Sequence, residues 1–277
     1  MTKKFGILAF PAKHSLSPVV QNAAFNEAGI DADFRVFEIS DAKFSEFIEY
    51  VKHEPVYGLS VSAPYKEQIM DSLSVMSDEV KEIGACNTVL NKGGLLYGFN
   101  TDYLGSNRAL EDVCGDLKGL RVMVIGAGGA SRAVIYGLVK AGAKVCVVNR
   151  HKEKAEKLAK EFGKNIEYGG LDEKENFDGY GVLVQASSIW LSGNFDSSDI
   201  EAFCPESFVQ KFEVVMDIIY QPIKTPLIKI AEKLGKKTVT GEKMFLYQAF
   251  EQFKIWTDEK APEEIMRDVL YKNLVMS

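Results

Sequence analysis

The sequence predicts an α/β protein with two domains, and three observations carry this prediction. The chain has 277 residues, 46% of them hydrophobic and 26% charged, so it can form one large or two ordinary packed cores. Strand-like and helix-like patterns alternate along most of the chain, which favours largely parallel sheets with helical crossovers. A glycine-rich turn at 126–131 joins a β-branched run directly to a helical pattern.

The first hundred residues begin this alternation. Ser17 and Pro18 predict a helix start, because a hydroxyl cap followed by proline is typical of a first helical turn. Gly29 is expected to end that helix, and Gly93-Gly94 is expected to turn a hairpin. The elements expected here are strands at 5–10, 34–39 and 56–62, helices from 17, from 41 (with Phe44, Phe47, Ile48 and Val51 on one face) and over 64–73, and a hairpin over 89–97.

A second unit is expected to begin near Asp102. A strand ending at Ile125 leads into the glycine-rich turn, and a helix is expected from Arg132 to Lys140. The other elements expected are strands at 144–148, 182–184 and 214–218, helices at 151–162 and 226–234, and a purely helical tail from Gly241. These patterns place domain boundaries near residues 102 and 240.

Charge and cysteine usage limit the function classes. The chain has 33 basic and 39 acidic residues, a net charge of −6, and no long basic run. This argues against nucleic acid or an anionic membrane surface as a partner. The four cysteines lie far apart with no paired spacing, which is typical of reduced thiols in a cytosolic protein rather than metal ligands or disulfides.

No segment of the sequence has the pattern of a signal peptide or membrane span. The apolar stretch at 5–10 is ended by Pro11 too early for a signal peptide. The longest apolar neighbourhood, 122–139, contains Arg132 and four glycines, which does not suit a bilayer. We therefore expect a soluble cytoplasmic protein.

The glycine-rich turn Gly126-Ala127-Gly128-Gly129-Ala130-Ser131 predicts a nucleotide site. Backbone amides at the start of the following helix, free of side-chain obstruction, can cradle a pyrophosphate that the helix dipole also favours. The turn follows a strand, opens a helix and leads to a second strand about twenty residues on, which is the context of a dinucleotide fingerprint. The alternative is a tight turn between core elements.

The end of that second strand indicates which dinucleotide binds. An NAD site usually has Asp or Glu there for the ribose hydroxyls, whereas this chain has Asn149-Arg150, followed by Lys152 and Lys154. A guanidinium without a carboxylate suits a 2′-phosphate. NADP is therefore favoured over NAD, although Lys152 is equally consistent with a solvated, basic helix start.

Polar residues outside this region gather where strands end. Ser15 and Ser17 flank Leu16 before a helix start, where hydroxyls and free amides could receive a carboxylate, unless Ser17 is a helix cap and nothing more. Lys66 is expected one turn into a helix and, taken alone, is typical of a surface lysine. The segments 87–88 and 100–102 each follow a strand-like or turn segment, and either could be a simple turn.

Taken together, these stretches resemble the shikimate dehydrogenase family, and the match runs through nearly the whole chain. Their order and spacing are far more specific than the glycine turn alone. The stretches that carry the resemblance are 11–18 (PAKHSLSP), 64–67 (PYKE), 84–88 (GACNT), 98–102 (GFNTD), 126–132 (GAGGASR), 149–150 (NR), 217–221 (DIIYQ), 225–226 (TP) and 244–248 (MFLYQ).

The resemblance implies an NADP-linked, reversible reduction of 3-dehydroshikimate to shikimate in aromatic amino-acid biosynthesis. It also implies a substrate domain at 1–102, a Rossmann NADP-binding domain at 103–240, and C-terminal helices at 241–277 that return to the first domain. Monomer and homodimer both stay open. The roles implied are a catalytic pair of Lys66 and Asp102, carboxylate binding by Ser15 and Ser17, ring contacts by Ser62, Asn87, Tyr220 and Gln248, and cofactor binding by Gly126, Gly128, Gly129, Ala130, Asn149, Arg150, Lys154 and Gly241.

The chemistry of hydride transfer is consistent with the implied catalytic pair. Transfer to a ketone leaves charge on oxygen, so a donor must lie within hydrogen-bond reach. The ammonium of Lys66 can stabilise that oxygen and deliver the proton, and Asp102 can orient both Lys66 and a neighbouring hydroxyl. We therefore interpret Lys66 as the main acid/base group and Asp102 as its orienting partner.

Two departures from the family pattern concern the expected site. The common Asn-Val-Thr before Pro-x-Lys is Ser60-Val61-Ser62 here, and some quinate/shikimate dehydrogenases also have Ser in place of that Thr. The usual Asn-Ala-Thr-Ser-x-Gly begins with Gln185 and ends with Trp190. Two alternatives follow: an enzyme that prefers quinate or another cyclic hydroxy acid, and a non-catalytic NADP-sensing protein, against which the presence of Lys66 and Asp102 argues.

Overall fold

The computed structural model describes residues 2–12, 15–163, 165–189 and 202–276. The chain divides into two compact units, each described by itself below. The first unit comprises Met1–Thr101 with Gln248–Ser277, and the second comprises Asp102–Tyr247. The sequence predicts one domain boundary after residue 102 and another after residue 240.

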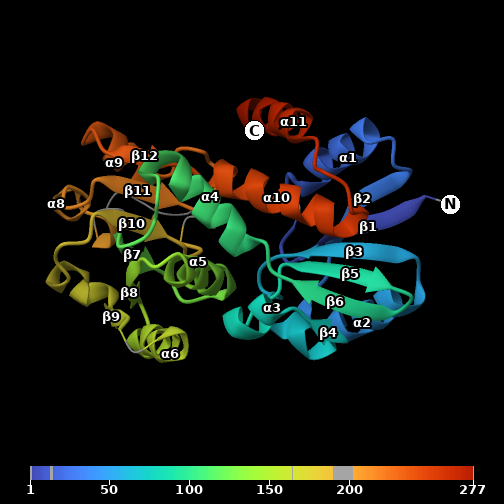
Figure 1. Cartoon of the computed structure of the whole chain (residues 1–277), viewed down its shortest axis with the longest axis horizontal. Coiled ribbons are helices and arrows are strands. Elements are labelled where there is room, and N and C mark those ends of the chain that lie inside the picture. The colour runs from blue at the N-terminus through green and yellow to red at the C-terminus, as the bar shows by residue number, and fades with distance from the viewer. Residues whose placement is uncertain (1, 13–14, 164, 190–201, 277) are drawn as a thin grey trace. The chain divides into compact units, whose positions relative to one another are not determined.

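The first unit is built on a six-stranded sheet with the order β2-β1-β3-β5-β6-β4 (Figure 1). Three of its five pairings are parallel, and β5 is antiparallel to both neighbours. The strands are β1 (Lys3–Ala9), β2 (Ala32–Glu38), β3 (Val56–Val61), β4 (Val75–Met76), β5 (Thr88–Lys92) and β6 (Leu95–Phe99). The hairpin β5–β6 turns at Gly93 and Gly94, both at positive φ, as the sequence predicts.

Two helices of this unit, α1 and α2, lie where the sequence predicts helices. The helix α2 (Phe44–His53) buries the four predicted apolar residues, each contributing roughly 1.5–3 kcal/mol by burial. The helix α1 (Ser17–Glu27) is followed by Gly29 at φ 66°, the left-handed residue that closes many helices. The other helices here are α3 (Asp78–Ile83), α11 (Glu263–Met276), and the short 3₁₀ segments η1 (Asp41–Lys43) and η2 (Gln68–Ser72).

Two local predictions are wrong. Leu16, not Ser17, occupies the N-cap of α1, and Ser17 is already helical; the Ser15 hydroxyl accepts a hydrogen bond from the Ser17 N–H at 3.3 Å. The segment 64–73 is turns followed by the 3₁₀ helix η2 rather than one helix. The Lys66 carbonyl accepts from the Cys86 N–H at 2.7 Å, so a tertiary bond replaces the i to i+4 bond of a helix.

The second unit contains six parallel strands in the order β12-β11-β10-β7-β8-β9. This is the order of a doubly wound dinucleotide-binding sheet, whose direction of winding changes between β7 and β10. The strands are β7 (Arg121–Ile125), β8 (Lys144–Asn149), β9 (Glu167–Gly170), β10 (Val182–Gln185), β11 (Val214–Asp217) and β12 (Lys237–Val239).

Helices cover both faces of this sheet, so its strands are apolar on both sides. Along β7, Val122 and Val124 face one core with α4, α5 and α6, whereas Met123 and Ile125 face the other with α8 and α9. The helices are α4 (Asp102–Cys114), α5 (Gly129–Lys140), α6 (Lys152–Phe162), α8 (Glu206–Val209) and α9 (Pro226–Lys233), with the 3₁₀ segment η3 (Leu171–Asn176).

The helix α10 (Gly241–Thr257) belongs to the second unit through Tyr247 and to the first from Gln248 onward. Within the first unit its aromatic residues join the core. The ring centroid of Trp256 lies 5.5 Å from that of Phe5, and the ring of Phe253 lies 5.6 Å from that of Phe25. The expected helical tail is therefore present.

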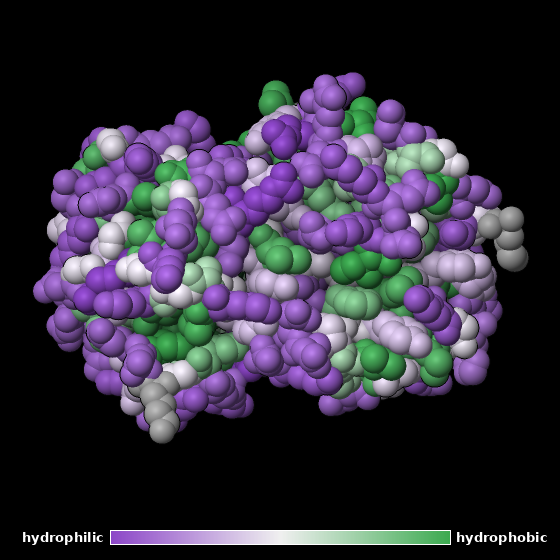
Figure 2. Space-filling model, viewed as in Figure 1, coloured by the Kyte–Doolittle hydropathy of each residue, from purple (hydrophilic) through white to green (hydrophobic). Residues whose placement is uncertain are grey.

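Surface hydropathy and helix length indicate whether a chain can contact or cross a membrane. On the face shown in Figure 2, hydrophilic side chains predominate and hydrophobic ones form separate areas between them. Within the described part of the chain, no helix combines the length and the apolar character needed to cross a membrane.

Candidate active site

The glycine-rich turn of the second unit requires glycine at its first position. Gly126 follows β7 with φ 128°, and its N–H donates to the Val148 carbonyl at 2.9 Å. A Cβ at Gly126 would lie 2.6 Å from Ser131 Oγ and 2.9 Å from the backbone after β10. A larger residue therefore meets both backbone strain and steric overlap.

The start of α5 is suited to an anionic ligand. Gly128 occupies its N-cap and is exposed, and a Cβ there would meet no protein atom within 4 Å. Gly129 and Ala130 form the first turn, which has no acidic residue, and no side chain caps this helix end. The amides of an uncapped twelve-residue helix next to open space fit a pyrophosphate. The helix begins three residues earlier than predicted.

Two serines near this turn carry no distinct signal in the sequence. Ser131 stands where a dinucleotide fingerprint has its third glycine or alanine, and its buried hydroxyl donates to the Ala186 carbonyl at 2.9 Å. The backbone nitrogen of Ser187 lies beside Gly126, and its buried hydroxyl finds no hydrogen-bond partner among the described residues. Such an atom points to a ligand group at the carboxyl end of β10.

The basic residues after β8 differ in their surroundings. Lys152 pairs with Glu173 at 2.7 Å, and the hydrogen bond to Glu173 raises the pKa of Lys152. Arg150 and Lys154 are exposed, and neither has an ion-pair partner in the described part of the chain. Asn149 ends β8 and donates through its amide to the His151 carbonyl at 3.0 Å. Arg150 and Lys154 therefore remain available for a phosphate.

The loop after β11 presses against the start of α10. A Cβ at Gly241 would lie 2.5 Å from the backbone carbonyls of Ile218 and Ile219, so only glycine fits. The half-buried Tyr220 packs against Phe245, with ring centroids 4.7 Å apart and ring planes tilted by 41°. The structure thus places Tyr220 and Gly241 in one local cluster.

Gln185, one of the departures from the family pattern, is fully buried at the end of β10. Its amide donates to the Ser187 carbonyl at 3.0 Å and to Asp217 Oδ1 at 3.3 Å, and its carbonyl oxygen accepts from the Ser187 N–H. Asp217 in turn accepts from Thr225, the N-cap of α9. Gln185 therefore holds the turn after β10. Trp190 lies outside the described residues.

In the first unit, Ser15 and Ser17 lie at the start of α1. Ser17 is buried and Ser15 is half-buried. The first turn of this eleven-residue helix has no acidic residue and no side-chain cap. A helix end of this kind, with two hydroxyls beside it, suits a carboxylate.

Lys66 and Ser62 lie in the turn that follows β3. The Ser62 N–H donates to the Leu8 carbonyl at 2.9 Å, and the Lys66 carbonyl accepts from Cys86. Tyr65 between them is buried, and its hydroxyl donates to the Ile39 carbonyl. The turn is therefore fixed by its main chain and by Tyr65, and the Lys66 side chain beside them is half-buried.

Asn87 is the centre of a buried polar cluster in the first unit. Its Oδ1 accepts from the Thr101 N–H at 2.8 Å, and its Nδ2 donates to Thr101 Oγ1 at 2.9 Å. The same nitrogen lies 3.4 Å from Gln248 Oε1. Two residues predicted to contact one ring, Asn87 and Gln248, thus lie together although 161 positions separate them.

Asp102, the second member of the predicted catalytic pair, is the first residue of α4 in the second unit. It is 4% exposed. Lys66 belongs to the first unit, so their pairing stays a prediction.

Three family models match the chain. The shikimate dehydrogenase substrate binding domain matches residues 7–89, shikimate/quinate 5-dehydrogenase matches 108–189, and the shikimate 5′-dehydrogenase C-terminal domain matches 241–271. A curated shikimate dehydrogenase (NADP(+)) from Aquifex aeolicus is 41% identical over 264 residues, covering 95% of this chain and 94% of that protein. The chain belongs to the shikimate dehydrogenase family.

Solved shikimate dehydrogenases share the fold over nearly their whole length. The crystal structure from Aquifex aeolicus has a TM-score of 0.88 at 40% identity and covers 97% of each chain. The structure from Thermus thermophilus, in complex with NADP(H) and shikimate, has a TM-score of 0.82 at 30% identity and covers 98% of this chain and 99% of that one. The family and the fold class predicted from sequence are confirmed.

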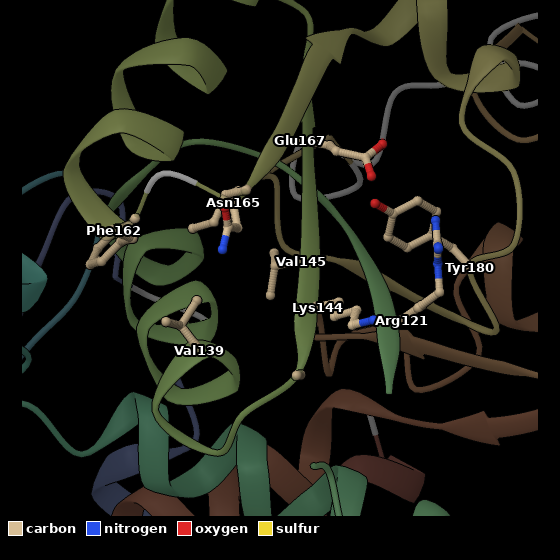
Figure 3. A pocket seen from close by; sticks show the side chains of 11 residues that line it. Arg121, Val139, Lys144, Val145, Phe162, Asn165, Glu167 and Tyr180 are labelled. Carbon is tan, nitrogen blue, oxygen red and sulfur yellow. The ribbon is translucent and has the colours of Figure 1, made fainter. Parts of the chain in front are cut away.

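This shikimate dehydrogenase family member also has a cavity of about 500 Å³ at the opposite, amino-terminal edge of the parallel sheet. Figure 3 shows the Tyr180 hydroxyl turned toward the Glu167 carboxylate, and the Arg121 guanidinium lies 4.6 Å from the Tyr180 ring. Burial raises the pKa of Tyr180, and it raises that of the nearby Cys146 thiol to about 12. The cavity is at the wrong edge of the sheet for the glycine turn, so we do not assign the cofactor to it.

Proposed function

We propose that this protein is an NADP-dependent shikimate dehydrogenase that reversibly reduces 3-dehydroshikimate to shikimate. The observation that carries the proposal is the presence of two complementary sites in a family member that spans nearly the whole length of its relatives. The second unit has an uncapped glycine turn followed by basic residues, and the first has a buried cluster of side-chain amides and hydroxyls. The cluster in the first unit suits a compact molecule rich in hydroxyl groups.

The first unit is assigned the substrate. Ser15 and Ser17 would receive the ring carboxylate at the start of α1, where two hydroxyls and the helix dipole favour an anion. Asn87 and Gln248 would bind ring hydroxyls with their amides, whose donors and acceptors match alcohols. Ser62, in the turn before Lys66, would add a hydroxyl contact.

The second unit is assigned the cofactor. Gly126, Gly128, Gly129 and Ala130 would hold its pyrophosphate, and Asn149, Arg150 and Lys154 would hold the adenosine ribose and its 2′-phosphate. Tyr220 and Gly241 would lie beside the nicotinamide and the ring. When bound, NADPH would supply a hydride to the ring carbon in ketone reduction, and NADP⁺ would accept it in alcohol oxidation.

Lys66 and Asp102 are assigned the proton chemistry. In ketone reduction the Lys66 ammonium donates a proton to the oxygen as that oxygen gains charge, and in alcohol oxidation the neutral amine takes it back. Asp102 accepts hydrogen bonds from Lys66 and from a neighbouring ring hydroxyl, which orients both groups. Lysine is suited to this proton transfer because its ammonium becomes a neutral amine when it gives up the proton, whereas an arginine would stay charged.

We further infer a cytoplasmic enzyme that is a monomer or a homodimer. Its four cysteines are free thiols, as expected in a reducing compartment.

Initial rates test the function. The purified protein is mixed with shikimate or quinate, each with NADP⁺ or NAD⁺, and formation of the reduced cofactor is followed by its absorbance. We expect the fastest turnover with shikimate and NADP⁺. Faster turnover of quinate would favour the related quinate/shikimate activity, and no turnover in any mixture would contradict an enzymatic role.

A further inference from the structure

Within the first unit, every fourth residue on one face of α10 lies next to every second residue of strand β3. A Cβ on Gly58 would lie 2.5 Å from Trp256 Nε1, and Gln252 Nε2 lies 3.1 Å from Ser60 Oγ. Four residues of a helix rise about 6.0 Å and two residues of a strand about 6.6 Å. Successive pairs of contacting residues can therefore continue along α10 and β3. The next step along the helix is Gln248, and the next along the strand is Ser62.

Gln252 therefore lies one helical step from Gln248 and in contact with Asn87, two residues assigned to the substrate. Its side chain is 1% exposed, and its Nε2 lies 3.1 Å from each of three acceptors: Ser60 Oγ, the Asn87 carbonyl and Thr88 Oγ1. The Asn87 carbonyl can only accept, so the NH₂ end of Gln252, and not its oxygen, must face this group. The orientation of the Gln252 amide is thereby determined.

A hydrogen-bond relay leads from Gln252 to the Asn87 side chain. Thr88 Oγ1 accepts from Gln252 and donates to Asn87 Oδ1 at 2.7 Å. The same Oδ1 also accepts from the Thr101 N–H. Asn87 Oδ1 thus accepts two short hydrogen bonds and lies 3.3 Å from a third donor, Thr101 Oγ1. The NH₂ group of the same amide is turned toward Thr101 Oγ1 and Gln248.

We propose that Gln252 is a positioning residue for the substrate. Acting through the Thr88 hydroxyl, it fixes the Asn87 amide so that its NH₂ group faces Gln248. There an oxygen of a polyhydroxylated ring can replace the long 3.4 Å contact to Gln248 Oε1 as acceptor. A flipped Asn87 amide would present its oxygen, an acceptor, to the ring. The Thr88 hydroxyl and the Thr101 N–H, which donate to Oδ1, would then lose their acceptor. This role rests on the function proposed above, and it adds Gln252 and Thr88 to the residues that determine ring recognition.

Two single variants remove the relay at different points. Gln252→Met keeps the length of the side chain and removes its donors, and Thr88→Val keeps the shape and removes the hydroxyl. We expect each to raise the KM for shikimate about tenfold, with kcat changed less than about threefold and the KM for NADP⁺ unchanged. Because both break the same relay, the double variant should raise the KM no further than the larger single effect.

Two matched controls separate positioning from simple loss of stability. Thr88→Ser retains the hydroxyl and should restore a KM near that of the wild type. Trp256→Phe removes another buried bond from the same face of α10, the donation from Nε1 to the Val89 carbonyl at 3.0 Å, without touching Asn87. It is expected to lower the Tm while leaving the KM for shikimate unchanged.

The outcomes distinguish this role from the proposed function. If the wild type oxidises shikimate but Thr88→Val and Thr88→Ser have the same KM, the positioning role is overturned and the proposed function stands. An equal rise in KM for Trp256→Phe would also overturn the role, because a general loss of packing would then explain the result. Absence of shikimate turnover by the wild type would overturn both. The Thr88 pair decides the question even if Gln252→Met does not fold.

Discussion

The glycine turn of the second unit and the Asn87 cluster of the first are built in different ways. The turn is a continuous stretch, Gly126–Ser131, that offers backbone amides at the start of α5. The cluster brings together side chains of residues 87, 88, 101, 248 and 252, separated by up to 165 positions.

This difference predicts different sensitivities. A site made from backbone depends on conformation, so it is damaged where glycine is replaced and is little affected by side chains around it. A site made from buried side chains depends on individual donors and acceptors, so removal of a single hydroxyl or amide leaves other buried groups unsatisfied.

Loss of the Lys66 ammonium should have the largest effect. Lys66→Met is expected to lower kcat by roughly 10²–10⁴-fold, because proton transfer to the developing oxyanion is lost. Binding of NADP⁺ should be unchanged. The measurements are steady-state rates and cofactor titration, with Lys81→Met as control, since Lys81 is exposed on α3 and pairs with its helix neighbour Asp78. Near-normal turnover in Lys66→Met would remove Lys66 from the acid/base role.

Replacement of the first glycine of the turn should come next. Gly126→Ala is expected to lower the free energy of unfolding by roughly 1–3 kcal/mol for the strained φ alone, and to weaken NADP⁺ binding. Gly128→Ala is the matched control, because φ is −99° and space is open there. It should fold with normal stability yet raise the KM for NADP⁺, since its methyl group enters the ligand space. Denaturant unfolding and cofactor titration measure both effects, and equal stability losses would contradict the contrast.

Charge after β8 should tune the choice of cofactor. Arg150→Ala is expected to raise the KM for NADP⁺ about tenfold and to leave the KM for NAD⁺ nearly unchanged, because only NADP⁺ has the 2′-phosphate. Lys152→Ala should have little effect, since Glu173 already holds that ammonium. The ratio of kcat/KM values for the two cofactors is the measurement. If Lys152→Ala changed that ratio as much as Arg150→Ala, our assignment of the phosphate contact would be incorrect.

The smallest expected effect is a pH dependence far from the glycine turn. Burial raises the pKa of the Cys146 thiol to about 12 in the folded state, above the ordinary value of about 8.5. Folding therefore favours the neutral thiol. The contribution of Cys146 to the free energy of unfolding is complete below about pH 8.5, and it is lost as the pH rises toward about 12 because the thiol of the unfolded chain ionises first. Cys146→Val, which cannot titrate, should show a smaller alkaline loss of stability.

Unfolding at neutral and alkaline pH measures that loss. Tyr180, whose pKa is also raised by burial, contributes in the same direction in both proteins. Because Cys146 also raises the pKa of Tyr180, the difference between wild type and Cys146→Val measures the thiol together with its interaction with Tyr180. Identical alkaline losses in the two proteins would show that Cys146 ionisation is not coupled to folding.

Much of the fold could be predicted because its signals are local. The apolar spacing of α2, the paired glycines of the β5–β6 hairpin and the strand–glycine–helix junction after β7 each depend on neighbouring residues. The errors arose where tertiary contacts decide. Lys66 was expected on a helix, but its carbonyl bonds to Cys86 instead. The short strands β4, β9 and β12 have two to four residues, too few to show a period.

The site was predictable only in part for the same reason. Ser187 gave a weak signal, a hydroxyl after the strand β10, and its significance rests on the burial of an oxygen that finds no partner among the described residues. Gln252 gave almost none, because a glutamine on a helix is ordinary. Its meaning comes from the three acceptors around its nitrogen.

By itself, the sequence determined the family, the strand–glycine–helix turn, the basic residues after β8 and the identity of the polar groups. The tertiary structure alone decided which of these groups meet: Gln252 with Ser60 and Thr88, Asn87 with Gln248, and Lys152 with Glu173. The physical reason is that backbone conformation is governed by adjacent residues, whereas the pairing of buried donors and acceptors depends on how distant elements pack in register.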